Sequence, residues 1–460
     1  MRKYDLCVIG AGSGGLVAAT TANRLGLKTV LLEKNKIGGE CTHSGCVPSK
    51  AFIYAAKTFH ASNEASRYGL PAYGAGDKLD FSRMMEHVNS IIDQVYANET
   101  PGVFEKMGID VVVHPSGAQF VNNTTVRIGE DAIEAQYTVV CTGSSPRIVC
   151  PDGSQRRDFL NNENFWALRE QPRSITFIGG GVISAELGQA LGRFGSEVRI
   201  IDHNPRILKV VDSDITEILM DQFREEGIEL YPDTEVLRCG VSEGKANLTL
   251  QSPSGTQTLE SDAVFLAIGR MPNTSGLNLE QAGVTYNDRG IQTDETLKTS
   301  ASNIYACGDV ASPAKFTHAA SYQADICVNN ILNENKKKSD LRAFPWAIFT
   351  EPEIGHVGIG EEQAVRDSIE HRVLRVDANL DRFVTDGKTT GLLKVILDQD
   401  DHVIGADAIG AHAGEWIHIL ALAARNRLPL QNIADTVFAY PTYSEIVKKA
   451  FTRYLRTKST

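Results

Sequence analysis

The sequence predicts an α/β fold in which two Rossmann-like dinucleotide-binding domains are followed by a C-terminal α+β domain. Residues 4–33 and 174–202 repeat one pattern, which is an apolar strand, a glycine turn, a helical stretch, a second strand and an acidic residue. In both segments the same number of residues separates the first glycine of the turn from the acidic residue. A duplication in register is far more specific than a single glycine-rich turn. It predicts two nucleotide sites in one chain.

The elements between and after the two repeats complete three domains. Helices are expected over residues 51–106 with a break around 69–76, β-hairpins over 111–126 and 236–259, and buried strands that end in glycine over 138–143 and 263–269. A charged linker at 336–340 precedes strand-like runs at 392–397 and 403–409 and an apolar helix at 415–425, which is typical of a separate α+β domain. We therefore expect one domain at residues 1–148 and 274–338, a second at 149–273 and a third at 339–460.

Composition narrows the class of protein. The 460 residues carry a net charge of -11, with 42% hydrophobic and 22% charged residues, as in an ordinary globular protein. The acidic balance argues against nucleic-acid binding, and no apolar run approaches the roughly 18 residues of a membrane-spanning helix. The chain enters its first strand directly, without a signal peptide. Only two of the eight cysteines are close in sequence, which disfavours a secreted disulfide framework and favours the cytoplasm.

The first glycine turn has the features of a phosphate-binding site. Gly10 permits the tight turn, Gly12 lets the backbone approach a pyrophosphate, and Gly15 lets the helix pack closely on the strand. The helix N-terminus then faces the phosphates, and Glu33 is placed to accept hydrogen bonds from ribose hydroxyls. The alternative is a glycine-rich turn with a purely structural role.

Two later segments are further candidates for the same site. Thr142 and Gly143 end one of the buried strands, and Gly308 and Asp309 follow a short strand of residues 303–307. An aspartate at such a strand end can bond a ribityl hydroxyl. A helix that starts near Thr317 and His318 would aim its positive N-terminal dipole at a flavin pyrimidine ring, where negative charge develops on reduction.

The decisive segment is the loop of residues 38–50, which contains Cys41 and Cys46. Four residues separate the two thiols, which is close enough for a disulfide. Pro48 suits the first turn of a helix, so Cys46 lies near a helix N-terminus, and this location lowers the pKa of a thiol. Lys50 adds positive charge one turn later. A structural disulfide or half of a metal site is the alternative, but no second pair of ligands at matching spacing is present, and we predict no metal site.

With this loop the chain resembles the class I pyridine nucleotide–disulfide oxidoreductases, the group of glutathione reductase, dihydrolipoamide dehydrogenase and mercuric reductase. The likeness covers nearly the whole chain. It implies bound FAD, with Cys46 facing the flavin and forming a charge-transfer complex with it, and Cys41 exchanging with the substrate. It also implies that Lys50 approaches flavin N5 and pairs with Glu186. The third domain would form a homodimer in which each subunit completes the active site of its partner.

The second glycine turn is predicted to bind the nicotinamide cofactor. Gly179 and Gly181 repeat the fingerprint, with Ser184 as a small substitute for the third glycine, and Gly269 ends the strand that closes this domain. Asp202 would accept from the 2′-hydroxyl of NAD and repel a 2′-phosphate. Arg206 lies nearby, behind Asn-Pro, but we expect NADH to be preferred to NADPH.

The C-terminal motif departs from the resembled family at its acid–base residue. Where the family has a histidine oriented by a glutamate, this chain has Tyr440 with Glu445 retained. A phenol titrates near 10 and an imidazole near 6.5, so Tyr440 is a poor base at neutral pH. Oxidation of dihydrolipoamide should be slow unless His43 or Tyr443 assists.

Two branches of the family share parts of this departure. Mercuric reductases resemble the chain in placing tyrosine at the histidine position, but they carry a C-terminal cysteine pair and often an N-terminal metal-binding domain, which the sequence lacks. Soluble transhydrogenases resemble it in Cys-Thr-His and Tyr-Pro-Thr but lack the thiol that Cys46 supplies. We expect an NADH-using disulfide or dithiol oxidoreductase, with a metal-ion reductase or a transhydrogenase/diaphorase as alternatives. A non-catalytic flavin-binding redox sensor is the interpretation the residues favour least.

Overall fold

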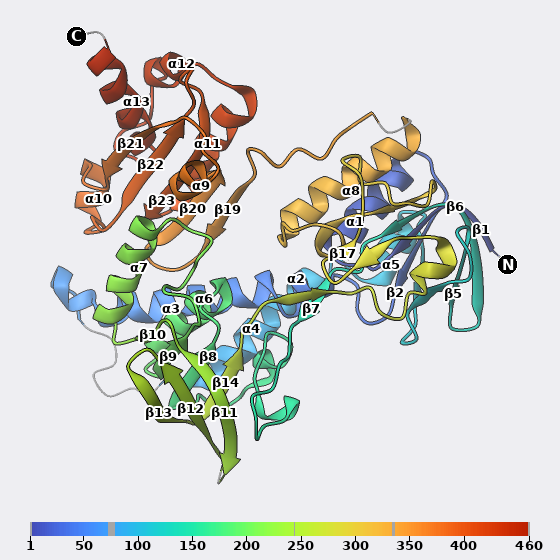
Figure 1. Ribbon diagram of the computed structural model, residues 1–460, viewed down its shortest axis with the longest axis horizontal. Coiled ribbons are helices and arrows are strands. Elements are labelled where there is room, and N and C mark those ends of the chain that lie inside the picture. The colour runs from blue at the N-terminus through green and yellow to red at the C-terminus, as the bar shows by residue number, and fades with distance from the viewer. Residues whose placement is uncertain (1, 72–78, 243, 334–335, 459–460) are drawn as a thin grey trace.

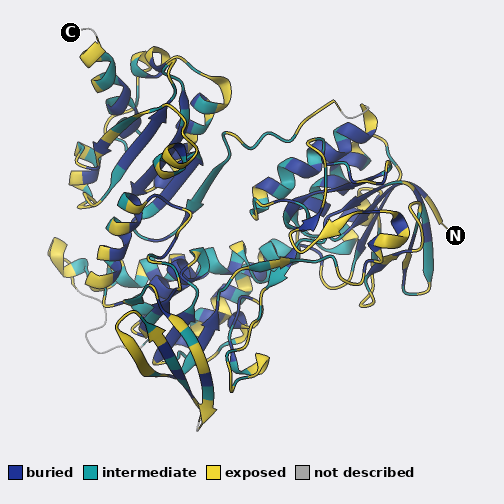
Figure 2. Cartoon of the chain, viewed as in Figure 1, coloured by how far each residue is buried: buried dark blue, intermediate teal, exposed yellow. Residues whose placement is uncertain are grey.

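A computed structural model describes residues 2–71, 79–242, 244–333 and 336–458, which form three lobes, each built around one sheet (Figure 1). The mixed α/β architecture confirms the predicted fold class. In Figure 2 the buried residues concentrate in the sheets and on the helix faces that pack on them. Among the described residues we find no helix whose length and apolarity would let it cross a lipid bilayer.

The first lobe contains a seven-stranded sheet with the strand order β3-β2-β1-β6-β5-β4, and β18 also pairs with β6. Its strands are β1 (Arg2–Ile9), β2 (Thr29–Glu33), β3 (Asp110–Val113), β4 (Ala118–Phe120), β5 (Thr125–Ile128), β6 (Asp131–Val140) and β18 (Ile304–Ala306). Helices α1 (Ser13–Arg24) and α8 (Thr317–Leu332) pack together on one face. Strands β1, β2, β3, β6 and β18 run parallel, so the loops at their carboxyl ends share one edge of the sheet.

The hairpin predicted at residues 111–126 is only partly correct. β3 pairs in parallel with β2, whereas β4 and β5 form an antiparallel hairpin that continues into β6. The reason is the connection: the chain leaves β2, passes through several helices and returns as β3, and a helical crossover of this kind produces a parallel neighbour.

The second lobe has a four-stranded parallel sheet in the order β10-β9-β8-β14. Its strands are β8 (Ser174–Ile178), β9 (Glu197–Ile201), β10 (Glu229–Tyr231) and β14 (Ala263–Leu266), with helices α6 (Val182–Arg193) and α7 (Ser213–Glu225). The hairpin predicted at residues 236–259 is instead a meander of β11 (Glu235–Ser242), β12 (Lys245–Ser252) and β13 (Gly255–Ser261). A Pro-Ser-Gly turn at residues 253–255 separates the last two strands.

The third lobe is an antiparallel sheet in the order β19-β20-β23-β22-β21, covered by helices. Its elements are β19 (Pro345–Ile348), β20 (Glu353–Gly358), α9 (Glu361–Arg366), β21 (Arg372–Asp377), α10 (Asp381–Thr385), β22 (Leu392–Leu397), β23 (Val403–Gly410), α11 (Ala413–Asn426), α12 (Leu430–Asp435) and α13 (Glu445–Lys458). The predicted strands at 392–397 and 403–409 and the helix at 415–425 are confirmed. The segment that follows α8 crosses from the first lobe to this one (Figure 1).

The helices of residues 46–106 connect the lobes. They are α3 (Cys46–Asn63), α4 (Phe81–Tyr96) and α5 (Pro101–Lys106), and the short α2 (Gly39–His43) precedes them. A 3-10 turn (Ala65–Tyr68) that ends at Gly69 follows α3. The rest of the predicted break, at 72–76, lies outside the described residues. α3 packs against α6 of the second lobe, where the buried Phe52 makes edge contacts with Phe165 and Phe194 at 5.4 and 5.2 Å.

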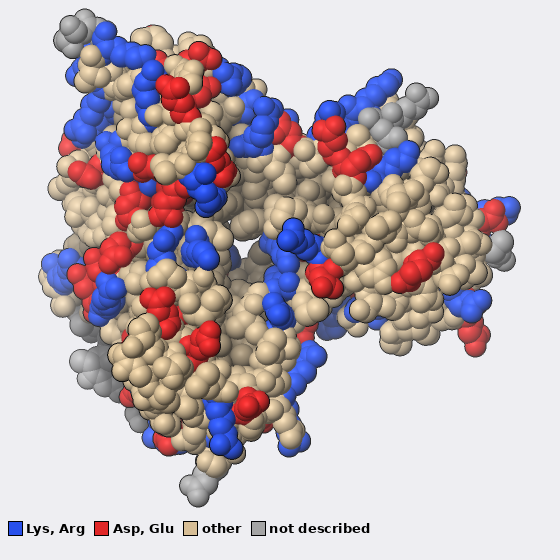
Figure 3. All heavy atoms as spheres, in the orientation of Figure 1, with Lys and Arg blue, Asp and Glu red and all other residues tan. Residues whose placement is uncertain are grey.

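Short pieces complete the chain. An antiparallel ribbon of β7 (Ser144–Pro146) and β15 (Arg270–Pro272) crosses between the first two lobes, and β16 (Tyr286–Asn287) pairs with β17 (Gly290–Ile291). In Figure 3, basic and acidic side chains are interspersed over the three lobes, and the surface is hollowed where the lobes meet. Neither sign of charge dominates this face.

Candidate active site

The two glycine turns have matching geometry. Gly10 and Gly179 have φ values of +97° and +102°, in the left-handed region that favours glycine. A Cβ on Gly10 would lie 2.5 Å from the carbonyl oxygen of Cys141, and one on Gly179 would lie 2.5 Å from that of Ala267. Each turn therefore passes so close to the end of the neighbouring parallel strand that only glycine, which has no Cβ, fits there.

The acidic residues after the second strands hold the turns in place. Glu33 Oε2 accepts a hydrogen bond from the Ala11 amide at 2.7 Å, and Asp202 Oδ2 accepts one from the Gly180 amide at 2.6 Å. A carboxylate offers about four acceptor sites. The remaining bonds of Glu33 go to backbone amides of its own loop, and those of Asp202 go to Asn204. Each carboxylate thus accepts three hydrogen bonds from the protein, and its predicted bond to a ribose hydroxyl stays a prediction.

The first turn fits a dinucleotide pyrophosphate. α1 starts after Gly12 without a side-chain cap, so its first amides have no side-chain partner and its positive dipole end is available to an anion. A Cβ on Gly12 would have nothing closer than 3.9 Å, and one on Gly143 nothing within 4 Å. These glycines leave open space on the cradle side, so the residues present fit FAD. When bound, FAD supplies the transfer of electrons between a nicotinamide and a thiol pair.

The loops at the carboxyl ends of β6 and β18 are tied together beside this cradle. The Ser144 hydroxyl donates to Asp309 at 2.5 Å, and the Thr142 hydroxyl donates to the Asn273 carbonyl at 2.8 Å. Gly308, next to Asp309, has a φ of +73°. The predicted residues Thr142, Gly143, Gly308 and Asp309 thus lie on two adjacent loops at this edge of the sheet.

Arg270 is a site residue that the sequence reasoning missed. Its guanidinium forms an ion pair with Glu40 of the redox loop, donates to Ser144 at 2.7 Å and lies 3.6 Å from Asp309. Its side chain is largely buried. The signal was its place immediately after Gly269, at the strand end that returns toward the first domain. Arg270 therefore links the redox loop to the flavin loops.

The redox loop places both thiols at the start of a helix. Cys41 lies in α2 and Cys46 is the first residue of α3, as the Pro48 signal predicted. Both are free thiols, and the Thr317 hydroxyl lies 3.4 Å from Cys46 Sγ. A hydrogen bond from Cys41, another from Thr317 and the charge of Lys50 lower the pKa of Cys46 to about 6. The same bond to Cys46, together with burial, raises the pKa of Cys41.

Lys50 and Glu186 form the ion pair that the resemblance implied, with Nζ and Oε2 2.8 Å apart. Glu186 is buried, and its other oxygen accepts the Phe349 amide at 2.9 Å. Lys50 Nζ lies 4.6 Å from the centre of the Phe349 ring. The lysine, the second-domain helix and the third domain therefore meet behind the redox loop.

At the second glycine turn, Ser184 is buried and its hydroxyl donates to the Gly179 carbonyl. A Cβ on Gly181 or Gly269 would meet nothing within 4 Å, which leaves open space for a nucleotide. The helix α6 begins after Gly181 without a side-chain cap. Its N-terminus therefore fits a pyrophosphate in the same way as the first turn.

Arg206, the cation near this second site in the sequence, contacts the third lobe. Its Nη2 pairs with Glu362 of the third lobe at 2.6 Å and donates to the Val211 carbonyl at 3.2 Å. The guanidinium therefore takes part in an interdomain contact. Asp202 keeps its acceptor position at the end of β9.

Tyr440 is exposed, with 70% of its surface accessible, and its hydroxyl donates to Asp381 at 2.6 Å. This hydrogen bond and the charge of Asp381 raise the pKa of Tyr440. Glu445, expected to orient the residue at position 440, instead accepts the Thr442 amide at 3.1 Å at the start of α13. Asp381 lies 59 residues before Tyr440, and no sequence motif indicates that the two residues are in contact.

The two local candidates to assist in place of the missing histidine, Tyr443 and His43, each contact residues of their own domain. Burial and a hydrogen bond to Asp386 raise the pKa of Tyr443 to about 12. His43 Nε2 lies 2.7 Å from the Ile37 carbonyl, and the ring packs edge-on against Tyr96 at 5.0 Å. Both side chains are committed to contacts within their own domains.

Of the two residues at the start of α8, only Thr317 contacts the redox pair. His318 Nε2 lies 2.7 Å from the Pro345 carbonyl, and its ring stacks on Phe344 at 4.5 Å. His318 therefore joins the first lobe to the entry of the third. Its predicted part in FAD binding stays a prediction.

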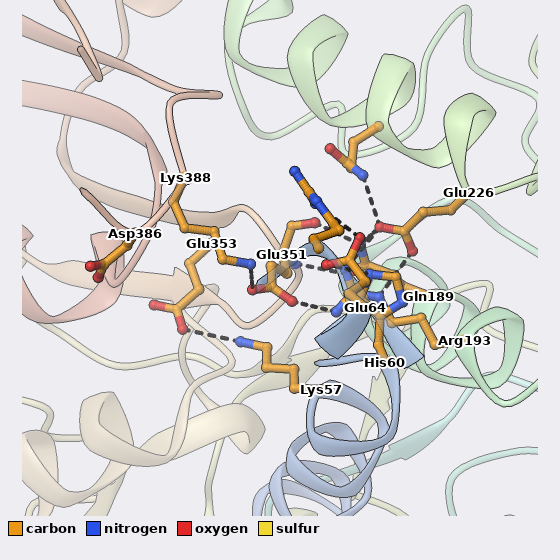
Figure 4. Close-up of polar contacts among 12 residues, drawn as sticks. Lys57, His60, Glu64, Gln189, Arg193, Glu226, Glu351, Glu353, Asp386 and Lys388 are labelled. Atoms are coloured by element: carbon orange, nitrogen blue, oxygen red, sulfur yellow. Dashed lines mark hydrogen bonds and ion pairs between the residues drawn. The ribbon is translucent and has the colours of Figure 1, made fainter. Parts of the chain in front are cut away.

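Behind this site, ion pairs join all three parts of the chain (Figure 4). Arg193 of α6 contacts Glu226 at 2.8 Å and Glu351 at 2.5 Å, and Lys388 contacts Glu351 at 2.7 Å. Lys57 of α3 pairs with Glu353 at 3.2 Å. These contacts fix α3 and α6 to the start of the third domain.

A possible cation-binding group lies far from this site in the sequence. Asp398, Asp400 and His402, in the turn between β22 and β23, are the one such cluster found among the described residues. Arg427 contacts Asp398 at 3.2 Å and His402 Nδ1 at 3.0 Å, so a cation already neutralises this turn. Exposed acidic turns of this kind are common without a metal.

The fold and site together define a flavin- and nicotinamide-dependent oxidoreductase with a dithiol between its cofactors and its substrate. The family model described as pyridine nucleotide-disulphide oxidoreductase matches residues 4–324, and that of its dimerisation domain matches residues 344–451. The chain belongs to this family, the class I pyridine nucleotide–disulfide oxidoreductases. It therefore binds FAD and a pyridine nucleotide and acts on a sulfur group.

Three relatives illustrate the breadth of the match. A mercuric reductase from Staphylococcus aureus is 32% identical, covering 97% of this chain and 82% of the relative. A dihydrolipoyl dehydrogenase from Bacillus subtilis is 33% identical over 97% and 96% of the two chains. The Cu(II) complex of the HOCl-induced flavoprotein disulfide reductase RclA from Escherichia coli superposes with a TM-score of 0.85 at 26% identity, covering 97% and 99%.

Proposed function

We propose that this protein is an NADH-dependent reductase that passes electrons outward through Cys41 and Cys46 to a disulfide with good leaving groups. The overall reaction takes one NADH, one proton and one disulfide to NAD⁺ and two thiols. The observation that carries the proposal is the pairing of Tyr440 with Asp381, because it raises the pKa of the phenol at the position where the family has a histidine.

The chain's own residues account for the exchange steps. Cys41 attacks the acceptor disulfide, and one acceptor thiolate leaves. The Cys46 thiolate, favoured by its pKa of about 6, then attacks the Cys41 sulfur of the mixed disulfide and releases the second acceptor thiol. This restores the Cys41–Cys46 disulfide for the next reduction. Lys50, paired with Glu186, holds positive charge close to the thiolate throughout.

The acceptor class follows from the raised pKa of Tyr440, which makes its phenol a weak proton donor to a leaving thiolate. A leaving thiolate of low pKa departs without protonation, whereas an alkyl thiolate such as that of lipoamide departs slowly. The reverse reaction, oxidation of dihydrolipoamide, needs a base to create the attacking thiolate. We therefore expect aromatic disulfides to be reduced faster than lipoamide.

The preference for NADH is supported by two side chains. Asp202 has one acceptor site left for a 2′-hydroxyl and would repel a 2′-phosphate. Arg206, the nearby cation, is paired with Glu362. A steady-state comparison should show a higher kcat/KM for NADH than for NADPH, and a preference for NADPH would overturn this assignment.

We place the function in a homodimer, with Tyr440 reaching the redox loop of the partner. The dimerisation-domain match supports the dimer, and the exposure of Tyr440 leaves its ring available to a second subunit. We further assign Glu33, Gly12 and Asp309 to FAD, and Gly181 and Asp202 to NADH, on the geometry described above.

The experiment that tests this function compares acceptors in two variants. With NADH as donor, the wild type should reduce an aromatic disulfide well and lipoamide poorly, and Tyr440→His should raise the lipoamide rate selectively. Cys46→Ser should abolish both activities while transfer to a quinone continues. Equal rates with both disulfides in the wild type, or disulfide reduction that survives Cys46→Ser, would contradict the proposal. The second outcome would favour a transhydrogenase or diaphorase.

A metal-ion reductase is the second candidate, favoured by one observation. Tyrosine at position 440 is the residue that mercuric reductases place there, and a mercuric reductase and a Cu(II)-bound flavoprotein are among the relatives. Two accessible thiols would bind a soft metal ion. NADH oxidation driven by Hg(II) or Cu(II), lost in Cys41→Ser, would support it.

A further inference from the structure

Five buried cysteines have no part in the exchange chemistry, and three of them lie close together: Cys141, Cys307 and Cys327. Cys141 follows β6, and Cys307 follows β18. These parallel strands are registered up to Val140 and Ala306, so the two cysteines are the next pair along. Their sulfur atoms lie 3.4 Å apart. Adjacent strands therefore bring two thiols of distant sequence position into contact.

This thiol pair is closed to large reactants. Cys141 and Cys307 are 7% and 1% exposed, and they lie among apolar residues that include Val8, Val139 and Ala324. A thiol-disulfide exchange needs an approaching sulfur in line with the bond, which burial prevents. Only a small uncharged molecule can reach these sulfurs. The pair is thus separate from Cys41 and Cys46, which are partly exposed.

The pair lies directly beneath the flavin cradle. A Cβ on Gly14, in the first turn of α1, would be 3.5 Å from Cys307 Sγ. Cys141 precedes Thr142 and Gly143, and Cys307 precedes Gly308 and Asp309. A bond between the two sulfurs would join the ends of the two strands whose loops form one side of that cradle.

We propose that Cys141 and Cys307 are a second redox pair, which a small hydroperoxide oxidises to a disulfide that clamps the two flavin loops together. The sulfur of one thiol attacks the peroxide, breaking the O–O bond and giving a sulfenic acid and water. The second thiol then displaces water to form the S–S bond. In total, two thiols and one hydrogen peroxide give one disulfide and two waters.

The geometry allows this bond with small movements. Neighbouring parallel strands lie about 4.8 Å apart, within the Cα separations that disulfides span. Cys327 of α8 is the competitor, because it also contacts Cys307. The strand pair is favoured because its two residues are in register, whereas Cys327 belongs to a helix.

Peptide mapping of the FAD-loaded protein tests the proposal. Trypsin places Cys141 in residues 128–147, Cys307 in 299–315 and Cys327 in 316–336, while Cys41 and Cys46 share residues 37–50. The protein is treated with hydrogen peroxide, freed of excess peroxide, unfolded in denaturant, alkylated and digested without reductant. A Cys41–Cys46 disulfide stays within one peptide, so it cannot be mistaken for a link between strands.

We expect loss of alkylation at Cys141 and Cys307 and a cross-linked peptide 128–147/299–315, reversed by dithiothreitol. The temperature at which the protein releases FAD should shift upward on oxidation. Cys141→Ala should remove the cross-link and the shift, Cys307→Ala should do the same, and Cys327→Ala should retain both. Full alkylation of Cys141 and Cys307 after Cys41–Cys46 has oxidised, or a link from Cys307 to Cys327 instead, would overturn the proposal.

Discussion

At the scale of the residue, the chemistry of this site depends on which of two neighbouring thiols holds the negative charge. Cys46 is the first residue of α3, receives hydrogen bonds from Cys41 and Thr317, and lies near Lys50. The two hydrogen bonds and the charge of Lys50 lower the pKa of Cys46, while the carboxylate of Glu186 raises it. Cys46, the thiol that the family places against the flavin, therefore carries the negative charge, and Cys41 stays protonated before it reacts.

The Cys46 pKa gives a prediction with opposite signs in two variants. In the reduced protein, Cys46 should lose its proton near pH 6, so the thiolate is present above that pH and lost below it. Lys50→Met removes a stabilising positive charge and should raise this pKa. Glu186→Gln removes a destabilising negative charge and should lower it. Ultraviolet absorbance of the thiolate across a pH titration measures both, and shifts of the same sign would contradict this account.

Much of the site was predictable residue by residue, because local geometry carries the signal. Gly10 and Gly179 are required by tight turns, and Cys46 is placed by the helix that Pro48 begins. Arg270 and Asp381 were not predictable, because their partners are distant in sequence: Glu40 is 230 residues from Arg270. The part of Glu445 in catalysis stays a prediction; its carboxylate accepts the Thr442 amide at the start of α13.

At the scale of the element, α6 connects the nicotinamide side of the site to the third domain through one face. Glu186, Gln189 and Arg193 follow helical spacing and all bind the segment Phe349–Glu351. Figure 4 shows Gln189 and Arg193 beside Glu351. Gln189 both donates to and accepts from the Glu351 backbone, at 2.7 and 2.8 Å. The helix that carries the second nucleotide turn thus also positions the Lys50 ion pair.

Arg193→Met should be strongly destabilising, whereas Lys388→Met should not. Arg193 is 5% exposed and pairs with both Glu226 and Glu351, so its loss leaves Glu226 without its cation and Glu351 with Lys388 alone. Breaking a buried pair of this kind costs about 3–5 kcal/mol. Lys388 is 43% exposed, and a surface pair contributes about 0–1 kcal/mol.

Urea unfolding of both variants at saturating FAD measures this difference. FAD is kept saturating because a ligand that binds only the folded state adds to the apparent stability. Similar shifts in the two midpoints would show that the Arg193 cluster contributes no more than a surface ion pair.

A strand or helix was predictable from the sequence where its own pattern of apolar residues determined it. The strand with which it pairs was not predictable, because pairing depends on distant parts of the chain. The apolar run at residues 392–397 is a strand in any arrangement, and it is β22 in the structure. The run at 111–113 also forms a strand, but its pairing with β2 depends on the helical crossover before it. The same limit explains the missed strand β13, whose exposed, polar side chains give no core-facing alternation.

At the scale of the whole molecule, the redox loop and Tyr440 belong to different lobes. Cys41 belongs to α2 and Cys46 begins α3, and α2 lies where the first two lobes meet (Figure 1). Tyr440 is exposed on the third lobe and pairs with Asp381 of its own lobe. Interdomain contacts such as Arg206 with Glu362 fix the third lobe against the second. The exposed tyrosine is therefore free to act on a neighbouring subunit.

Mixing two inactive variants tests this arrangement. If each site combines Cys46 of one subunit with Tyr440 of the other, a heterodimer of Cys46→Ser and Tyr440→Phe chains has one intact site and one site with both changes. Random reassociation in a C2 dimer should then restore about a quarter of the wild-type rate. The acceptor must be one whose reduction falls sharply in Tyr440→Phe alone.

The alternative arrangement gives a different number from the same mixture. If Tyr440 serves the thiols of its own chain, every site in the heterodimer carries one change, and mixing restores nothing. Mixing each variant with itself after the same dissociation step is the control for damage during handling. Asp381 accepts a hydrogen bond from the Tyr440 hydroxyl within the third lobe. Recovery of activity in the mixture therefore requires that this lobe, with the Tyr440–Asp381 pair intact, faces the redox loop of the partner subunit.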